Sequence, residues 1–296
     1  GALSLTSIPD SIAVVGGGYI GLELGTAFAK LGSQVMVIEA AHSILPHYDA
    51  DLTRPVQKHL TELGIEVLSG TRVNQVQGNQ VEILRADGET QTVTADKVLV
   101  TVGRQPNTQS CGVNELQLTM NGPFIEIDNR CQSSMRGVYA IGDVTGEPML
   151  AHRAMAQGEM VAEIIAGRQI SWDKQCIPAV CFTDPEIVTV GLSPAEALAE
   201  DHEISVGQFP LQANGRAMTM ESDSGFVRVV ASKHDGVLLG VQAVGQGVSE
   251  LSAAFALAIE MGACAEDIQS TVHAHPTLSE SFAEACMQVT GSALHI

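Results

Sequence analysis

Apolar and polar positions at the start of the chain predict a β-α-β unit. An apolar run at 12–15 is typical of a buried strand, and it leads through glycines into a helix-like run at 22–31. Gly32 suits the left-handed position after a helix, and a second apolar strand follows at 35–38. The same order of helix, glycine and strand returns at 55–67, so we expect a parallel sheet.

The period of the pattern then changes to two. Alternation at 73–84, a polar turn and a strand-like run at 92–102 predict a β-meander inserted into the α/β unit. A strand at 137–141 and a helix at 151–166 are expected next. Beyond residue 172 strands precede helices, which is typical of an α+β domain; the expected elements are strands at 188–190, 226–231 and 238–244, and helices near 250–261 and 280–289.

Composition narrows the function classes. The 296 residues are 45% apolar and 17% charged, enough apolar surface to build a core. A net charge of -19 repels phosphate backbones and anionic lipid, so neither nucleic acid nor membrane is an expected partner. No apolar stretch reaches the roughly 18 residues needed to span a bilayer. The start resembles no secretory signal and six scattered cysteines form no disulfide framework, so we expect a cytoplasmic protein.

A G-x-G-x-x-G motif directly follows the first strand and opens the first helix, as a dinucleotide site requires. Its first glycine permits the tight turn, its second lets backbone approach a pyrophosphate, and its third allows close packing of helix on strand. A merely glycine-rich turn is the alternative. The motif comprises Gly16, Gly17, Gly18, Tyr19, Ile20 and Gly21.

A carboxylate closes the second strand. Glu39 lies eighteen residues after Gly21, where it can accept hydrogen bonds from both adenosine ribose hydroxyls. Residues 40–43 include no Arg or Lys, so a 2′-phosphate would face the carboxylate without a cation. We therefore expect NAD rather than NADP, although Glu39 could be only a solvated acid.

Four further motifs narrow the identification. They lie at 103–107, 138–143, 148–152 and 273–280. With the glycine motif, in this order and spacing, the chain resembles the pyridine nucleotide–disulfide oxidoreductases over essentially its whole length, and most of all the members that oxidise dihydrolipoamide. The resemblance implies an α/β fold class with three parts: a Rossmann-type NAD-binding domain with β-meander at 1–104, the remaining half of a FAD-binding domain at 105–174, and an α+β interface or dimerisation domain at 175–296.

The resemblance also implies cofactor roles. The motif glycines would line the NAD pyrophosphate, Glu39 the ribose, and Val73 and Gly103 the adenine side, while Tyr19 and Glu23 would stand between nicotinamide and flavin. On the FAD side, one residue would bond the sugar-like chain and a helix start would present backbone amides to the flavin; these are Asp143 and then Met149, Leu150, Ala151 and His152. Asp143 could instead be an N-cap or turn residue. No metal site is expected.

His275 and Glu280 resemble the acid–base dyad of the family, which acts across a dimer interface on the active disulfide of the partner subunit. A dithiol with a pKa near 8.5 is only a few per cent ionised at neutral pH, so an imidazole must take its proton while a carboxylate holds the ring. The segment 277–280 also reads as a capping box opening the last helix, and both roles are compatible. His273 reads as structural.

The family also carries features that this sequence lacks. A first G-x-G-x-x-G for FAD and a redox Cys-x4-Cys are expected before the NAD domain, yet the NAD strand begins at residue 12. A region of about 100–150 residues is therefore missing from the sequence. Cys176 and Cys181 have the right interval, but in an extended strand they lie too far apart to be bridged.

The function implied for the intact protein is oxidation of dihydrolipoamide through a redox disulfide and FAD to NAD. Its partners would be a second copy in a homodimer and the lipoyl domain of a 2-oxo acid dehydrogenase complex or related lipoyl protein. The chain alone is expected to be inactive. The alternatives are another NAD(P)-dependent disulfide reductase of the family, or a non-catalytic module that binds NAD or dimerises.

Overall fold

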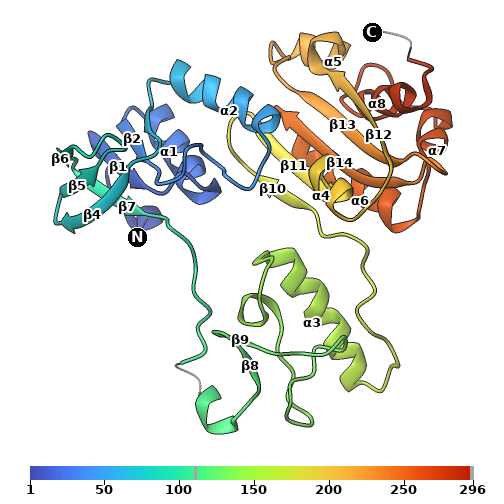
Figure 1. Ribbon diagram of the computed structural model, residues 1–296, viewed down its shortest axis with the longest axis horizontal. Coiled ribbons are helices and arrows are strands. Elements are labelled where there is room, and N and C mark those ends of the chain that lie inside the picture. The colour runs from blue at the N-terminus through green and yellow to red at the C-terminus, as the bar shows by residue number, and fades with distance from the viewer. Residues whose placement is uncertain (110–111, 294–296) are drawn as a thin grey trace. The chain divides into compact units, whose positions relative to one another are not determined.

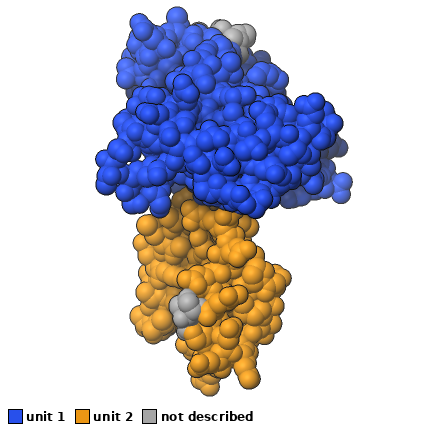
Figure 2. All heavy atoms as spheres, turned by 90° about the vertical axis from the view of Figure 1, so that its left-hand side faces the viewer, with its two compact units in different colours: residues 1–102, 178–296 blue, residues 103–177 orange. Residues whose placement is uncertain are grey.

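The computed structural model describes residues 1–109 and 112–293. The chain divides into two compact units, which Figure 2 distinguishes by colour. The first unit joins residues 1–102 to residues 178–296, and the second comprises residues 103–177. Among the described residues, no helix is long and apolar enough to cross a membrane.

The first unit begins with the expected β-α-β arrangement. A parallel sheet has the order β3-β2-β1-β7, and the prediction of parallel pairing is confirmed. Helix α1 starts at Tyr19, three residues before the predicted start, because the glycine turn passes directly into the helix. The elements are β1 (Ser11–Val15), α1 (Tyr19–Lys30), β2 (Gln34–Ile38), α2 (Ala50–Glu62), β3 (Glu66–Leu68) and β7 (Lys97–Val100).

The meander is a separate antiparallel sheet of β4 (Arg72–Gln77), β5 (Gln80–Leu84) and β6 (Thr90–Thr94). The prediction of one strand over 92–102 is wrong, because the chain changes sheets between β6 and β7. Asp96 marks the change: its Oδ2 accepts hydrogen bonds from the N–H and the hydroxyl of Ser11, each 2.9 Å away. This long-range contact anchors the start of β7 beside β1.

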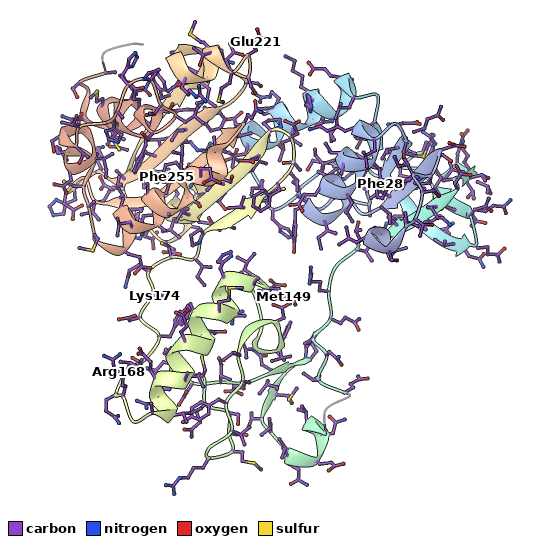
Figure 3. The ribbon with its side chains drawn as sticks, turned by 180° about the vertical axis from the view of Figure 1, so that it is seen from behind. Phe28, Met149, Arg168, Lys174, Glu221 and Phe255 are labelled. Atoms are coloured by element: carbon purple, nitrogen blue, oxygen red, sulfur yellow. The ribbon has the colours of Figure 1, made fainter. Side chains whose placement is uncertain are left out.

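The C-terminal part of the first unit is built on a five-stranded antiparallel sheet with the order β10-β11-β14-β13-β12. Phe255, labelled in Figure 3, packs edge to face against Phe282, with ring centroids 4.9 Å apart. The predicted strands and the last two long helices are confirmed, and β10 and β12 are additional strands. The elements are β10 (Ala179–Cys181), β11 (Glu186–Gly191), α4 (Pro194–Ala199), β12 (Ile204–Pro210), α5 (Gly215–Thr219), β13 (Phe226–Ser232), β14 (Leu238–Gly245), α6 (Ser252–Glu260), α7 (Ala265–Ser270) and α8 (Glu280–Thr290).

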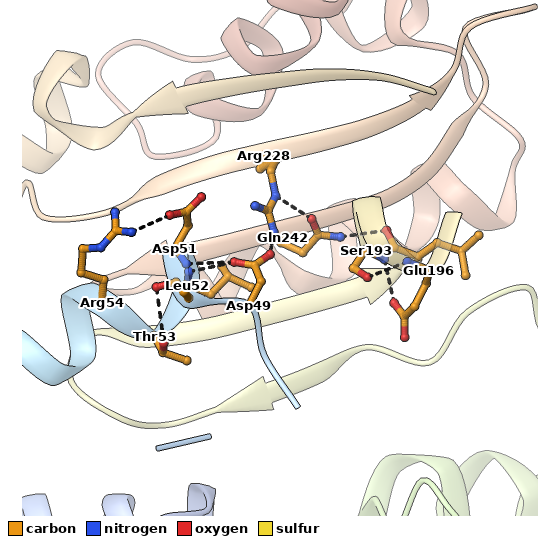
Figure 4. A network of polar contacts seen from close by, with 11 residues as sticks. Asp49, Asp51, Leu52, Thr53, Arg54, Ser193, Glu196, Arg228 and Gln242 are labelled. Atoms are coloured by element: carbon orange, nitrogen blue, oxygen red, sulfur yellow. Dashed lines mark hydrogen bonds and ion pairs between the residues drawn. The ribbon is translucent and has the colours of Figure 1, made fainter. Parts of the chain in front are cut away.

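The two segments of the first unit share one core, and α2 packs against β14 (Figure 1). Apolar side chains from both segments meet in one cluster that includes Ile44, Leu52, Val56, Cys181, Ile187, Phe226 and Val244. A polar network crosses the same boundary (Figure 4). Buried Arg228 donates to Asp49, the N-cap residue of α2, and its Nε donates to Gln242 Oε1 at 2.9 Å. The network fixes the start of α2 on the antiparallel sheet.

The second unit holds a short hairpin of β8 (Met120–Asn121) and β9 (Phe124–Ile125), a 3₁₀ helix at Gly142–Thr145, and α3 (Ala151–Ile165). The prediction of a strand at 137–141 is wrong. Only a single bridge forms there, between Gln132 and Tyr139. Cys131 has a positive φ of 58°, which turns the partner segment out of an extended ladder.

Candidate functional site

The glycine turn between β1 and α1 has open space beside Gly18, whereas Gly16 and Gly21 are tightly packed. A Cβ on Gly21 would lie 2.2 Å from the Gly16 carbonyl oxygen, so helix and turn pack in direct contact. Gly16 itself has φ +106°, a conformation that favours glycine. No atom lies within 4 Å of a Cβ position on Gly18, the N-cap residue of α1. The turn therefore presents open backbone at a helix N-terminus, which suits a pyrophosphate.

Glu39 reaches back to this turn from the end of β2. Its Oε2 accepts a hydrogen bond from the Gly17 N–H and its Oε1 accepts one from the Ala41 N–H, both at 2.6 Å. Each carboxylate oxygen has a second acceptor position, and the side chain is half-buried. The carboxylate thus shapes the loop and can still accept from the hydroxyls of a ribose.

Tyr19 and Glu23 lie on one face of α1, one helical turn apart. Tyr19 is exposed, whereas Glu23 is half-buried and its Oε1 accepts a hydrogen bond from the Phe182 N–H at 2.8 Å. Burial raises the pKa of Glu23, and the hydrogen bond from Phe182 opposes part of that rise. Burial raises the pKa of neighbouring Tyr48 as well. Ile20, which follows Tyr19 in α1, is half-buried.

Val73 and Gly103, the two residues expected on the adenine side, belong to different units. Val73 lies in β4 and packs against Ile38, Val81 and Ile83. Gly103 is the first residue of the second unit, with φ +128°. The structure does not place these two residues in one unit, and their role stays a prediction.

The residues expected on the flavin side all lie in the second unit. Asp143 is in the 3₁₀ helix, and its Oδ2 lies 4.0 Å from Arg104 Nη1. Ile141 is the N-cap residue there, so Asp143 is a first-turn residue and not the cap. Its side chain is 43% exposed and accessible to a hydroxylated ligand.

The four residues whose backbone amides are expected to face the flavin, at 149–152, lie in a turn and at the start of α3. Met149, visible in Figure 3, donates its N–H to Glu147 Oε2 at 2.9 Å, and Leu150 donates to the Pro148 carbonyl at 3.0 Å. Ala151 and His152 are the first two helical residues, and the N-cap Leu150 offers no side-chain cap. The uncapped helix start carries the positive end of the helix dipole.

The dyad is formed by a loop and the first residue of α8. His275 Nδ1 lies 2.9 Å from Glu280 Oε1, and Glu280 Oε2 accepts from the Thr277 N–H at 2.8 Å. The His275 side chain is 76% exposed and that of Glu280 only 26%. Because the carboxylate accepts a hydrogen bond from Nδ1–H, Nε2 is the ring nitrogen that can take up a proton.

Glu280 is held in its charged form. Partial burial alone would raise its pKa, but the hydrogen bonds from Thr277 and His275 outweigh it and lower the pKa. The predicted reciprocal capping box is only half formed: Ser279 is the N-cap residue, and the Thr277 hydroxyl donates to the Ala274 carbonyl instead of capping the helix.

His273 contacts backbone, and Cys181 is a buried free thiol. His273 Nδ1 lies 2.8 Å from the Thr271 carbonyl oxygen. Cys181 ends β10 as a buried free thiol, so it is not bridged to Cys176. Burial raises the pKa of Cys181 to about 11, which keeps the thiol protonated at neutral pH.

Comparison with known proteins agrees with this geometry. The sequence profile of the pyridine nucleotide-disulphide oxidoreductases matches residues 1–158, and that of their dimerisation domain matches residues 177–286. The chain belongs to this family. It is 53% identical over 295 residues to a dihydrolipoyl dehydrogenase of Pseudomonas aeruginosa and 46% identical over 300 residues to dihydrolipoyl dehydrogenase 2 of Haloarcula marismortui.

These matches cover 100% and 99% of this chain but only 64% and 63% of the two relatives. That coverage agrees with the expectation that a domain-sized region of the family is not in this sequence. The fold is similar to that of LpdA from Mycobacterium tuberculosis, with a TM-score of 0.87 and 29% identity over 96% of this chain and 62% of that one. The HOCl-induced flavoprotein disulfide reductase RclA from Escherichia coli gives a TM-score of 0.86 and 25% identity over 95% and 65% of the two chains.

Sequence reasoning missed two buried side chains that support the loop before α3. Arg153 donates to the carbonyls of Gly146 at 2.5 Å and Pro148 at 3.0 Å, and Gln157 accepts from the Gly142 N–H at 2.8 Å. Both are polar residues, one turn apart on α3 and each less than a tenth exposed. Polar residues one turn apart look like a solvated helix face, so no signal in the sequence separated them.

Proposed function

We propose that this chain is the NAD-binding, partial FAD-binding and interface portion of a dihydrolipoyl dehydrogenase, with these roles assigned to residues 1–104, 105–174 and 175–296. The observation that carries the proposal is the 2.9 Å contact between His275 Nδ1 and Glu280 Oε1, on a histidine whose side chain is 76% exposed. The names of the two relatives support the substrate assignment.

The first unit fits NAD. Open backbone at Gly18 suits the pyrophosphate, Glu39 suits the adenosine ribose, and Tyr19 and Glu23 suit the nicotinamide side. No Arg or Lys follows Glu39 within residues 40–43, so a 2′-phosphate would meet a carboxylate and no cation. The chain should therefore prefer NAD to NADP.

The second unit fits one side of FAD. Asp143 can accept a hydrogen bond from the sugar-like chain, and the start of α3 offers amides and a positive dipole end to a reduced, anionic flavin. Bound FAD would supply electron transfer between a redox disulfide and NAD. Because the expected redox cysteines and the first nucleotide fold are not in this sequence, the chain alone should not turn over lipoamide.

The dyad would handle the proton of the substrate. A dihydrolipoamide thiol is mostly protonated at neutral pH, and His275 Nε2 would take its proton as the thiolate forms. Glu280 would orient the ring through Nδ1 and stabilise the imidazolium. We propose that the dyad serves the disulfide of the partner subunit in a homodimer, that the substrate arrives on a lipoyl domain, and that the protein is cytoplasmic; the match to the dimerisation domain supports the dimer.

Half-reaction kinetics test this role. A full-length enzyme can be assembled by fusing the preceding region of the P. aeruginosa relative to Gly1, and its flavin reduction followed by stopped flow. We expect His275→Gln to slow reduction by dihydrolipoamide about 10²–10⁴-fold while reduction by NADH is unchanged. Equal slowing of both half-reactions, or of neither, would contradict the role; a fusion that binds NAD but never oxidises dihydrolipoamide would favour the non-catalytic alternative.

A further inference from the structure

A buried amide lies beneath the loop that carries the dyad. Asn214 is 3% exposed and is the N-cap residue of α5. Its Oδ1 accepts from the Ala217 N–H at 2.9 Å, which caps that helix. Its Nδ2 donates two hydrogen bonds, to the Thr277 carbonyl oxygen at 3.0 Å and to Ser281 Oγ at 2.9 Å. One side chain therefore ties α5 to both sides of Glu280.

A chain of hydrogen bonds connects Asn214 to the His275 ring. Thr277, fixed through its carbonyl by Asn214, donates its N–H to Glu280 Oε2 at 2.8 Å, and Glu280 Oε1 meets His275 Nδ1 at 2.9 Å. A second contact comes from the same segment: a Cβ on Gly215 would lie 3.8 Å from His275 Cε1. The ring thus lies beside the residue that follows Asn214.

The exposure of His275 makes this support necessary. A side chain that is 76% exposed has little packing to fix its rotamer, so its direction depends on its hydrogen bond to Glu280. We infer that Asn214 is a positioning residue, which fixes the Glu280 carboxylate through Thr277 and thereby aims the His275 ring. The catalytic consequence rests on the proposed function, whereas the effect on Glu280 does not.

Asn214→Asp removes the supporting donor, but it also adds a negative charge at a buried position. The variant keeps the side-chain size and the acceptor that caps α5, but it replaces the donor to Thr277 with an oxygen about 3 Å from a carbonyl oxygen. Asn214→Ser is the second variant, since serine caps helices yet is too short to reach Thr277. The matched control is Gln288→Ala, which removes a hydrogen bond from the Gln208 N–H at the far end of α8.

The first measurement is an NMR titration of the Glu280 carboxyl carbon in the 296-residue chain, assigned with Glu280→Gln. Because the Thr277 N–H lowers the pKa of Glu280, the neutral variant Asn214→Ser should raise that pKa, while Gln288→Ala should not. Asn214→Asp should raise it further, because its own charge repels the Glu280 carboxylate. An unchanged titration in Asn214→Ser, or the same shift in Gln288→Ala, would overturn the inference.

The second measurement is stopped-flow reduction of the full-length fusion. A reacting group displaced by about 1 Å can cost about 10²-fold, so a loosened ring should slow reduction by dihydrolipoamide on the order of 10-fold, with reduction by NADH unchanged. If His275→Gln slows this half-reaction but the Asn214 variants do not, the positioning role is wrong. If His275→Gln has no effect while the Asn214 variants still shift Glu280, the proposed function fails and the positioning role stands.

Discussion

Replacement of Glu39 by Ala should weaken both the fold and the nucleotide site, because this carboxylate serves both. Its two oxygens accept backbone N–H groups of Gly17 and Ala41 at 2.6 Å. Hydrogen bonds to charged groups contribute about 1.5–3 kcal/mol each, and water reaches this half-buried site, so we expect a combined loss of about 2–3 kcal/mol. For a unit of this size the melting temperature should fall by roughly 4–12 °C.

Nucleotide selectivity should change in the same variant. NAD loses the acceptor for its ribose hydroxyls, a loss of about 1.4–2.8 kcal/mol or roughly 10–100-fold in affinity. NADP loses less, because the repulsion of its 2′-phosphate disappears with the carboxylate. The ratio of the two dissociation constants should therefore narrow.

Thermal melting and calorimetry at constant low salt check both effects. Glu66→Ala, which removes an exposed carboxylate from the neighbouring strand β3, is the matched control and should leave both unchanged. The melting temperature and the NAD preference of Glu39→Gln should lie between those of the wild type and Glu39→Ala, since the glutamine amide keeps one acceptor oxygen. An unchanged melting temperature would refute the reasoning about loop support, and an undiminished preference for NAD would refute the reasoning about the ribose.

Three further predictions follow from other parts of the chain. The purified chain should be colourless and should keep far less than one equivalent of FAD after desalting, with no NADH–lipoamide turnover, because half of the flavin pocket is absent; stoichiometric flavin would contradict this. Arg228→Ala should lower the free energy of unfolding by about 2 kcal/mol in urea, because Asp49 loses a buried partner but stays partly solvated; Lys233→Ala, on an exposed turn, should not. The pKa of Glu280 is lower in the folded protein than in the unfolded chain, so Glu280 should make the wild type more stable than Glu280→Gln. This difference in the free energy of unfolding should be complete above about pH 4.3 and should vanish as the pH falls through the folded pKa. A difference that stays constant across that pH range would contradict the prediction.

The elements that the sequence predicted correctly are those whose signal is local. The strand at 12–15, the glycine turn and the following helix are set by neighbouring residues, and the structure has all three. The single strand expected at 92–102 was wrong, because the contact that ends it joins Asp96 to Ser11, 85 positions earlier. Periodicity within a run of residues carries no information about such a partner.

The same distinction applies to the site. The contact between His275 and Glu280 spans five residues and follows a motif, so the sequence could suggest it. Asn214 lies 63 positions before Thr277 and resembles an ordinary N-cap, which it also is. Its second role depends on burial against a distant loop, and burial of a single polar residue has no sequence signature.

The shared core of the first unit has a consequence for the order of synthesis. Leu52 and Val56 of α2 pack in one cluster with Phe226 and Val244, which are synthesised 170 to 192 residues later. At about 5–20 residues per second, that face of α2 waits roughly 10–40 seconds for its partners. During this interval α2 has only the part of the cluster that precedes residue 66, and the positions that pack on the later strands stay exposed. Chaperone capture of chains stalled between residues 102 and 178 should therefore include this part of α2.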